Sequence, residues 1–178
     1  MKLNLGCGQV KLDGYLNCDI SSTVNPDMVI NLEKKLPFKD DSVDEIIAYH
    51  VIEHVWNIIP LINEMHRVVK KGGRIDIRVP YYSSSAAASD LTHLHPFSFT
   101  SFDYVEFEPK GKNHIGKIQS HEYGDIRFKF FKKEIVFCRT YTFFGLYFFA
   151  NKFPNIYEAF FANLFPANEV HFILEVVK

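Results

Sequence analysis

The chain opens with a short apolar segment, Leu3–Leu5, that runs directly into Gly6-Cys7-Gly8. Glycine lets a backbone turn sharply and approach a ligand closely, so this arrangement leaves bare N–H groups beside a bound molecule. Eleven residues after Gly8, a second apolar segment ends in Asp19, where a carboxylate can accept hydrogen bonds from a ribose diol. Together the two features predict an α/β fold that binds a cofactor containing a nucleoside.

The hydrophobic pattern along the chain predicts a mostly parallel sheet. Short apolar segments bounded by turn residues are expected as strands at Leu3–Leu5, Tyr15–Asp19, Met28–Ile30, Val43–Tyr49 and Arg74–Val79. Between the last two, apolar residues recur every three or four positions from Ile52 to Val69. This spacing predicts one amphipathic helix that ends at Lys70–Gly73 with a glycine cap. Strands that alternate with a helix imply a parallel sheet covered on both faces.

The second half of the chain is expected to close this sheet. Alternating apolar residues at Glu169–Val177 predict an antiparallel strand, and Ile126–Phe131 and Ile135–Cys138 are two further strand candidates. The sequence contains no internal repeat and no clear linker, so we expect a single domain over residues 1–178.

The connection between the first two strands is short for a nucleotide-binding fold. A dinucleotide-binding βαβ unit places about twenty residues between its glycines and the acidic residue. Here only Gln9–Gly14 and the start of the next strand intervene, so we expect the first crossover helix to be shortened or absent. A pyrophosphate would then lack a helix N-terminus to meet its charge, which argues against NAD. A ligand with one carboxylate needs less, and loop N–H groups with Gln9 or Lys11 could hold it.

Composition and charge exclude several classes of protein. The 178 residues suit one domain with one core, and a net charge of −1 gives no basic surface for nucleic acid. The three cysteines have neither disulfide nor metal-ligand spacing, which fits a reducing cytoplasm. Met1-Lys2 leads directly into the first strand, so we expect no signal peptide. The longest apolar run, Phe143–Ala150, is too short for a transmembrane segment.

Five motifs follow one another in the first half of the chain: Leu3–Gly8, Gly14–Asp19, Asn31–Phe38, Ser42–His54 and Glu64–Gly73. In this order they resemble the class I S-adenosylmethionine-dependent methyltransferases, specifically a small group similar to methyltransferase type 11. The second half is similar only to members of this group, through Asp90-x-x-His93, Ser101-Phe102, Tyr157-Glu158 and Phe165-Pro166-Ala167. Two positions depart from the family pattern: Val10 stands in place of a third glycine, and Asn31 in place of aspartate.

The resemblance implies a Rossmann-like three-layer sandwich that uses S-adenosyl-L-methionine. The glycine loop would pass under the methionine part of the cofactor, and Asp19 would accept both ribose hydroxyls. The residues after the third strand would flank adenine, and the end of the fourth strand would offer a carbonyl to the ammonium group. The expected cofactor-binding residues are Leu5, Gly6, Cys7, Gly8, Asp19, Ile20, Asn31, Leu32, Tyr49 and His50.

The implied function is transfer of a methyl group to an acceptor, which in this group is a small molecule or a glycan or lipid precursor. We expect a cofactor-binding half at residues 1–80, an acceptor-site lid or insert at 81–125, and closing strands with an aromatic helical region at 126–178. Two other functions stay open. One is a non-catalytic subunit or sensor that binds S-adenosylmethionine or S-adenosylhomocysteine, and the other is an NAD-dependent dehydrogenase.

Histidines are the expected catalytic groups, because a base is needed if the acceptor is a hydroxyl or a protonated amine. The first candidate is His93, with Asp90 as its orienting carboxylate, and His50 is the second. A structural role is more common than a catalytic one for any single histidine of this kind.

Metal ligands are a further interpretation of the same histidines. His93-x-His95 with Glu53 or His121 would offer suitable atoms, but no third ligand has diagnostic spacing. We therefore expect no metal.

Phenylalanine is unusually frequent, and most of the 18 residues lie in the second half of the chain. The tract Phe143–Phe149 and the later Tyr157, Phe160, Phe161 and Phe165 exceed what one buried face can hide, although core packing is expected for most of them. The remainder would line an acceptor pocket, form the face of a homodimer or rest on a membrane surface.

Overall fold

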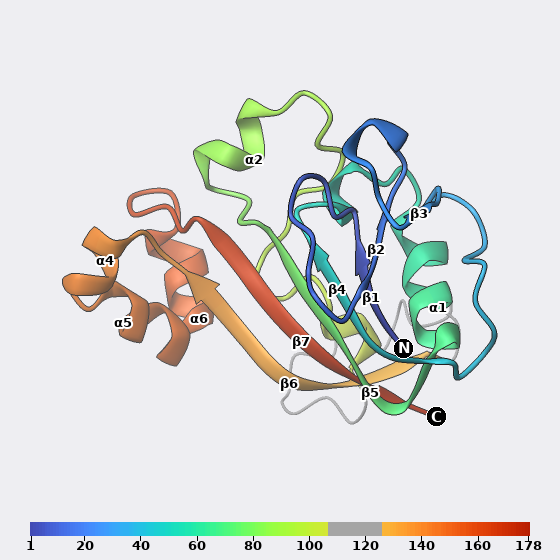
Figure 1. The fold of residues 1–178 in the computed structure, drawn as a ribbon. Helices are drawn as coiled ribbons and strands as arrows, with labels where there is room; N and C mark the ends of the chain where they lie inside the picture. The colour runs from blue at the N-terminus through green and yellow to red at the C-terminus, as the bar shows by residue number, and fades with distance from the viewer. Residues whose placement is uncertain (107–125) are drawn as a thin grey trace.

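The structure, a computed structural model, describes residues 1–106 and 126–178 (Figure 1). Within these residues, seven strands form one sheet in the order β3-β2-β1-β4-β5-β7-β6. The strands are β1 Lys2–Leu5, β2 Leu16–Asp19, β3 Met28–Val29, β4 Val43–Tyr49, β5 Val69–Pro80, β6 Arg127–Val136 and β7 Glu169–Val177. The helices are α1 Ile58–Val68, α2 Ser85–Ser89, α4 Arg139–Phe143, α5 Leu146–Lys152 and α6 Pro154–Ile156.

The predicted fold class is confirmed. Strands β1 to β5 pair in parallel, whereas β7 is antiparallel to both β5 and β6. The bounds of β4 and β7 are those predicted, and β1, β2 and β3 differ from prediction by one residue at one end. The hydrophobic pattern is reliable here because alternate side chains of these strands enter the core.

No helix forms between β1 and β2, as the short connection predicts. Two buried asparagines support the connecting loop instead. The side-chain N–H of Asn4 donates to the carbonyl of Val10 at 3.0 Å and to Oδ1 of Asn17 at 2.9 Å. Oδ1 of Asn17 also accepts the backbone N–H of Leu12 at 2.8 Å. Side chains of β1 and β2 therefore stabilise a loop at the position where a crossover helix is usual in this type of fold.

The long helix predicted from Ile52 to Val69 is wrong in its first part. Ile52–His54 forms a single 3-10 turn, and α1 begins only at Ile58. Pro60, in the first turn of α1, explains the break, because its ring would clash with the preceding turn of a longer helix and it has no N–H to donate.

The predicted glycine cap after this helix is also wrong. Strand β5 starts at Val69, directly after α1, and includes both Gly72 and Gly73. Gly72 has φ +75°, and a Cβ on Gly73 would lie 2.6 Å from Cγ1 of Val69 and 2.8 Å from the carbonyl oxygen of Asp44. The two glycines therefore lie in a β-bulge, where the pairing of β4 with β5 changes register, and they do not end a helix.

The two strands predicted at 126–131 and 135–138 are one continuous strand, β6. Its pairing with β7 shifts register between Phe130 and Lys132. A bulge of this kind bends an edge strand without ending it, and charged residues are common on such edges. Residues 132–134, which lie between the two predicted strands, are therefore part of β6.

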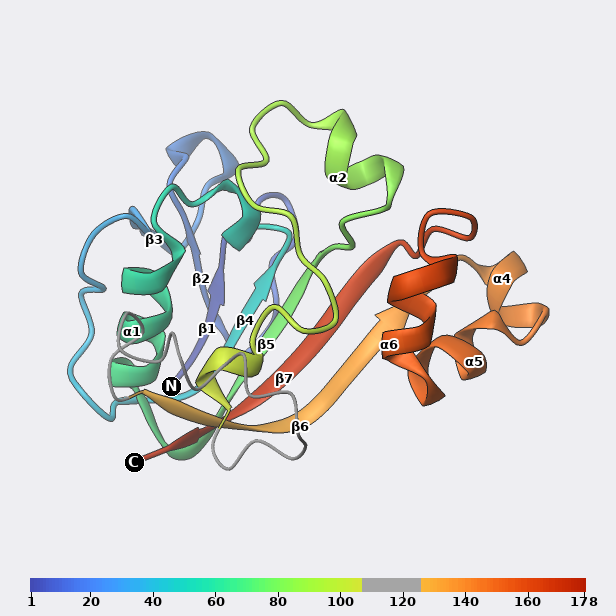
Figure 2. The same cartoon turned by 180° about the vertical axis from the view of Figure 1, so that it is seen from behind.

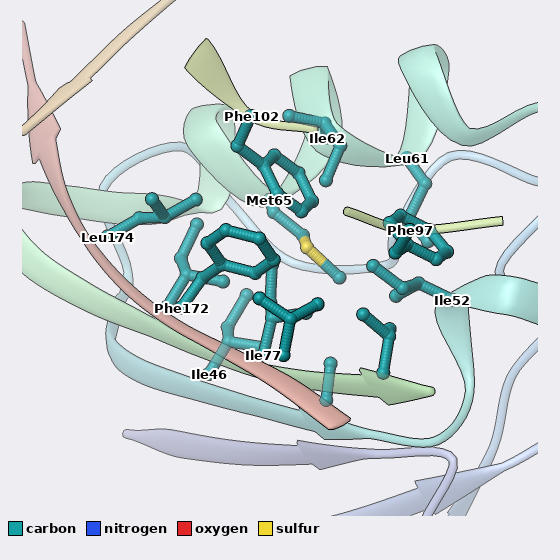
Figure 3. Close-up of a cluster of buried hydrophobic side chains, with 14 of the residues drawn as sticks. Ile46, Ile52, Leu61, Ile62, Met65, Ile77, Phe97, Phe102, Phe172 and Leu174 are labelled. Atoms are coloured by element: carbon teal, nitrogen blue, oxygen red, sulfur yellow. The ribbon is translucent and has the colours of Figure 1, made fainter. Parts of the chain in front are cut away.

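Helix α1 and the segment 97–105 cover one face of the sheet, as seen in Figure 2. Figure 3 shows the core that forms between them. Side chains of α1, including Met65, pack with Phe97 and Phe102 over Ile77 and Phe172 of the sheet. Met65, Ile77 and Phe172 are fully buried. Burial of a side chain of this size contributes about 1.5–3 kcal/mol, so this face carries most of the apolar stabilisation.

No helix of the described residues covers the opposite face, which is nearer the viewer in Figure 1. Tyr49, Arg78 and His171 lie in register across β4, β5 and β7. The Arg78 guanidinium lies 4.8 Å from the Tyr49 ring centroid, and Nε2 of His171 lies 2.8 Å from Oδ1 of Asp76. The charged groups of this face pair with one another, whereas the sequence pattern predicts helices on both faces.

Candidate functional site

The candidate site lies at the carboxyl edge of the parallel strands, where the loops after β1 and β4 meet. Gly6 follows β1 with φ +65°, and a Cβ at this position would lie only 2.3 Å from Cγ2 of Val51. Real Cβ atoms do not approach another carbon so closely, and a left-handed φ is unfavourable for a residue with a side chain. The glycine is therefore required by both the turn and the approach of the β4 loop.

Asp19, at the end of β2, holds the glycine loop in place. Its Oδ2 accepts the backbone N–H of Gly8 and its Oδ1 accepts that of Ser21, both at 2.9 Å. The N–H of Cys7 donates to the carbonyl of Cys18 at 3.0 Å and extends the strand pairing into the loop. An ionised carboxylate has about four acceptor positions, so two remain for a ligand.

A cavity opens between these loops and the segment after β3. Its lining residues come from four separate parts of the chain, and they are Gly6, Asp19, Ile20, Ile30, Asn31, Leu32, Glu33, Val51, His54 and Val55. Five of the predicted cofactor-binding residues are thus brought together: Gly6, Asp19, Ile20, Asn31 and Leu32. The wall is mainly apolar, and the carboxylate of Asp19 provides the polar end.

Some cavity residues escaped the sequence prediction. Val51, His54 and Val55 all lie in the loop that leaves β4, and they reach the cavity because Gly6 has no side chain. Glu33 accepts the backbone N–H of Trp56 and so joins the β3 segment to the same loop. Val51, His54 and Val55 could have been found from the sequence, because they come directly after a predicted parallel strand. The carboxyl ends of such strands face the ligand in this type of fold.

Other predicted residues lie beside the cavity and do not line it. Leu5 and Cys7 are buried under the loop. The ring of Tyr49 is on the opposite face of the sheet, where burial and the nearby charge of Asp76 raise its pKa to about 12. Lys11, considered for a ligand carboxylate, donates instead to the carbonyl of Asn25.

His50 ends β4 in an unusual backbone conformation, with φ +52°. A left-handed φ in a residue with a side chain marks a strained position, and such positions cluster at functional sites. Nε2 of His50 lies 3.3 Å from Oε1 of Glu169, and Nδ1 lies 3.6 Å from Oε1 of Glu53. The carboxylates of Glu169 and Glu53 raise the pKa of His50 to about 9, so its imidazole is protonated at neutral pH.

Residues 82–96 form a closed loop over this edge of the sheet, with α2 at its tip (Figure 1). The two ends of this loop are joined by a backbone hydrogen bond, which the N–H of Tyr82 donates to the carbonyl of Phe97 at 2.8 Å. Oε1 of Glu158 accepts the hydroxyl of Tyr81 at 2.9 Å and the N–H of Phe99 at 2.7 Å. One carboxylate from the C-terminal helical region therefore ties both ends of the loop.

The inner side of this loop faces the end of β4. The N–H of Leu94 donates to the carbonyl of Glu53 at 2.8 Å, and Nε2 of His95 donates to the carbonyl of Val55 at 2.9 Å. His93 lies with its Nε2 4.0 Å from Oε1 of Glu53 and 3.9 Å from Oδ2 of Asp90. His93 and His95 therefore have different partners, although the sequence analysis considers them together as candidate metal ligands.

Asp90 does not hold the imidazole of His93 by a hydrogen bond. Its Oδ1 accepts both the N–H and the hydroxyl of Thr92, at 2.8 and 2.7 Å. Nδ1 of His93 is bonded to the carbonyl of Ala87 at 3.2 Å. His121, the other candidate metal ligand of the sequence analysis, lies outside the described residues.

Comparison with known proteins supports the interpretation of the fold. Residues 3–77 match the methyltransferase domain family. A protein of Mycolicibacterium smegmatis, described as a probable S-adenosylmethionine-dependent methyltransferase, is 35% identical over 72 residues, which are 40% of this chain and 28% of that protein. The chain thus spans less than a third of the curated relative's length.

Solved structures show the same fold at low sequence identity. A SAM-dependent methyltransferase from Archaeoglobus fulgidus has a TM-score of 0.55 and 16% identity, with 98% of this chain and 85% of that chain covered. A methyltransferase from Haloferax volcanii, solved in complex with the Trm112 activator, has a TM-score of 0.58 and 14% identity, with 99% and 82% covered. None of the helices in residues 1–106 and 126–178 is both long and apolar enough to cross a membrane.

Replacement of Gly6 with alanine is expected to lower the free energy of unfolding by about 3 kcal/mol or more, since it combines an unfavourable φ with overlap against Val51. Gly14→Ala is the matched control, because Gly14 also has a positive φ, +79°, but no atom within 4 Å of the added Cβ. The control should lose only about 1–2 kcal/mol. Urea unfolding of both variants measures the difference, and equal losses would show that Val51 yields without cost.

Proposed function

We propose that this chain is a class I S-adenosylmethionine-dependent methyltransferase that binds S-adenosyl-L-methionine and transfers its methyl group to a small-molecule acceptor such as a glycan or lipid precursor. The observation that carries the proposal is the cavity that joins Gly6, Asp19 and Asn31 at the carboxyl edge of the sheet. These are residues at which the family resemblance predicts cofactor contacts, and they come from three separate segments.

The chemistry of the cavity fits the parts of this cofactor. Asp19 retains two acceptor positions for the ribose hydroxyls after binding Gly8 and Ser21. The apolar side chains of Ile20 and Leu32 suit an adenine ring. When bound, S-adenosyl-L-methionine supplies a methyl group on a positively charged sulfur. Leu5, Cys7, Tyr49 and His50 would then act through their backbone or as support beneath the cofactor.

The acceptor is proposed to enter under the loop 82–96. This loop brings His93 and Asp90 to the edge that also contains His50. Methyl transfer from a sulfonium is an in-line displacement, so alignment of the acceptor supplies much of the rate. His50, held in the protonated form by two carboxylates, suits binding of a negatively charged or hydroxyl group of the acceptor better than proton abstraction.

A dehydrogenase is the less favoured function. The loop between β1 and β2 contains no helix, so a dinucleotide pyrophosphate would have no helix N-terminus at the glycines. A non-catalytic subunit that binds the same cofactor would use the same cavity. Activity measurements therefore distinguish it from an enzyme.

The C-terminal helices present an aromatic surface that we propose as the face of a homodimer. Phe143, Phe144, Phe148 and Phe160 are each at least 70% exposed, whereas Tyr157 is buried. Exposed aromatic groups at this density are typical of an interaction surface. Contact with a membrane surface is the alternative occupant. We further propose a cytoplasmic location, on the basis of the three free cysteines.

Asp19→Ala is expected to weaken S-adenosyl-L-methionine binding by about 2–4 kcal/mol, or about 30- to 1,000-fold, through loss of charge-assisted hydrogen bonds. Isothermal titration calorimetry measures the dissociation constant. Asp13→Ala removes an exposed carboxylate from the same connection and should leave the affinity unchanged. An unchanged affinity in Asp19→Ala would contradict the proposed binding mode.

His93→Ala is expected to lower turnover at least tenfold and to leave the affinity for S-adenosyl-L-methionine within about twofold. An acceptor screen that measures release of S-adenosylhomocysteine provides the assay. A protein that binds the cofactor but methylates no acceptor in such a screen would favour the non-catalytic subunit.

The double variant Phe144→Ser, Phe148→Ser is expected to convert a dimer into a monomer in analytical ultracentrifugation, because both side chains are exposed on the single chain. Leu91→Ser is the control, since Leu91 is 97% exposed on a different surface. If the wild-type protein is a monomer that co-sediments with liposomes, the aromatic surface contacts a membrane and does not form a dimer. A wild-type monomer that does not bind liposomes would contradict both the dimer and the membrane contact.

A further inference from the structure

Glu53 is the one buried carboxylate of the described residues for which neither oxygen has a hydrogen-bond partner. Its side chain is 1% exposed, and it lies in the turn that follows β4. A buried anion without hydrogen bonds is costly, so such a group normally binds a cation or takes up a proton. Its nearest charged neighbour, Nδ1 of His50, is 3.6 Å away, beyond hydrogen-bond distance, and His50 lies closer to Glu169.

His93 directs an electron pair toward this carboxylate. Its Nδ1 lies 3.2 Å from the carbonyl oxygen of Ala87, which can only accept, so Nδ1 carries the proton. In the neutral imidazole, Nε2 is then an unprotonated acceptor, and it lies 4.0 Å from Oε1 of Glu53. A histidine that ligates a metal is typically oriented in this way, with its other nitrogen donating to a backbone carbonyl.

His54 has the same protonation pattern for a different reason. The hydroxyl of Thr92 donates to Oδ1 of Asp90 at 2.7 Å, so its oxygen accepts from Nδ1 of His54 at 2.8 Å. The Nε2 of His54 is therefore also an acceptor. Asp90, predicted to orient His93, instead orients His54 through Thr92.

Three side chains of metal-ligating type thus lie close together. A carboxylate oxygen of Glu53 and ring nitrogens of His54 and His93 all lie within 4.8 Å of one another, and the two rings are 4.7 Å apart between centroids. Three acceptors facing one another repel unless a cation lies between them. We propose that Glu53, His54 and His93 form a binding site for a transition-metal cation, with Zn²⁺ as the representative ion.

The ligand types select the class of metal. Imidazole nitrogens suit Zn²⁺, Co²⁺ and Fe²⁺, whereas Mg²⁺ and Ca²⁺ prefer oxygen ligands. Two histidines and one glutamate are also the protein ligands of several catalytic zinc sites, which keep a further position open. In a tetrahedral site with bonds of about 2.1 Å the ligand atoms lie about 3.4 Å apart, so the three side chains close by about an ångström on binding.

The position of the site suggests its use. His54 belongs both to this cluster and to the cavity that contains Gly6 and Asp19. An acceptor hydroxyl bound at the open position would lie beside the cofactor, and the ion would lower the pKa of that hydroxyl. This role rests on the proposed function, whereas binding of the ion does not.

The test begins with wild-type protein freed of metal by a chelator and then dialysed. Isothermal titration with Zn²⁺, repeated with Co²⁺, is expected to show one ion bound per chain, and Mg²⁺ at the same concentrations should not compete. Zn²⁺ at a hundredfold excess over its dissociation constant should also raise the Tm by about 5–10 °C. These measurements use no acceptor and no S-adenosyl-L-methionine.

Glu53→Gln and His93→Gln should each weaken Zn²⁺ binding at least 100-fold and abolish the rise in Tm. His66→Gln is the control, because His66 lies outside the cluster and donates a hydrogen bond to the carbonyl of Val177 at 2.9 Å. The Zn²⁺ affinity of this variant should stay within threefold of the wild-type value. Glu53→Gln is also expected to fold at least as stably as the metal-free wild type, since it removes a buried charge whose oxygens accept no hydrogen bond.

Absence of saturable Zn²⁺ and Co²⁺ binding by the folded wild type would overturn the inference. Equal Zn²⁺ affinity in the wild type and in Glu53→Gln would also overturn it. Calorimetry with S-adenosyl-L-methionine on the same preparation separates this result from the proposed function, because cofactor binding that persists without metal leaves that function standing.

Discussion

The site depends on how closely two loops can approach at the carboxyl edge of the sheet. Gly6 after β1 leaves room that Val51 of the β4 loop fills, to the point that a Cβ would lie 2.3 Å from the valine. Because of this contact, the β4 loop borders the cavity that contains Gly6 and Asp19 and brings His54 into its wall. The same turn contains the buried Glu53, whose Oε1 lies 4.0 Å from Nε2 of His93.

A second constraint acts from the opposite end of the chain. Glu158, in the helical region that joins β6 to β7, accepts from Tyr81 and Phe99 and so closes the base of the loop 82–96. Charge-assisted hydrogen bonds of this kind contribute about 1.5–3 kcal/mol each, enough to hold a loop whose tip has few buried residues. The C-terminal region thereby sets the distance of His93 from the β4 turn.

Several candidate residues could be predicted because each directly follows an apolar segment that is recognisable as a strand from the sequence. Asp19 and Asn31 each follow an apolar segment that forms a parallel strand, and the carboxyl ends of such strands share an edge. His93 was singled out only as a histidine in the segment after β5. Its partners, the carbonyl of Ala87 and the carboxylate of Glu53, depend on how a loop folds back and cannot be read from spacing.

The sequence by itself determined the parallel strands, the absence of a first crossover helix and the place of Gly6 and Asp19 at one edge of the sheet, because strand periodicity, glycine and a short connection act over a few neighbouring residues. Only the tertiary structure decided that the glycines after α1 lie within β5 and that one face of the described sheet has no helical cover. It also decided the cluster of Glu53, His54 and His93. These features depend on contacts between residues far apart in the chain, and such contacts, unlike periodicity, leave no local signal.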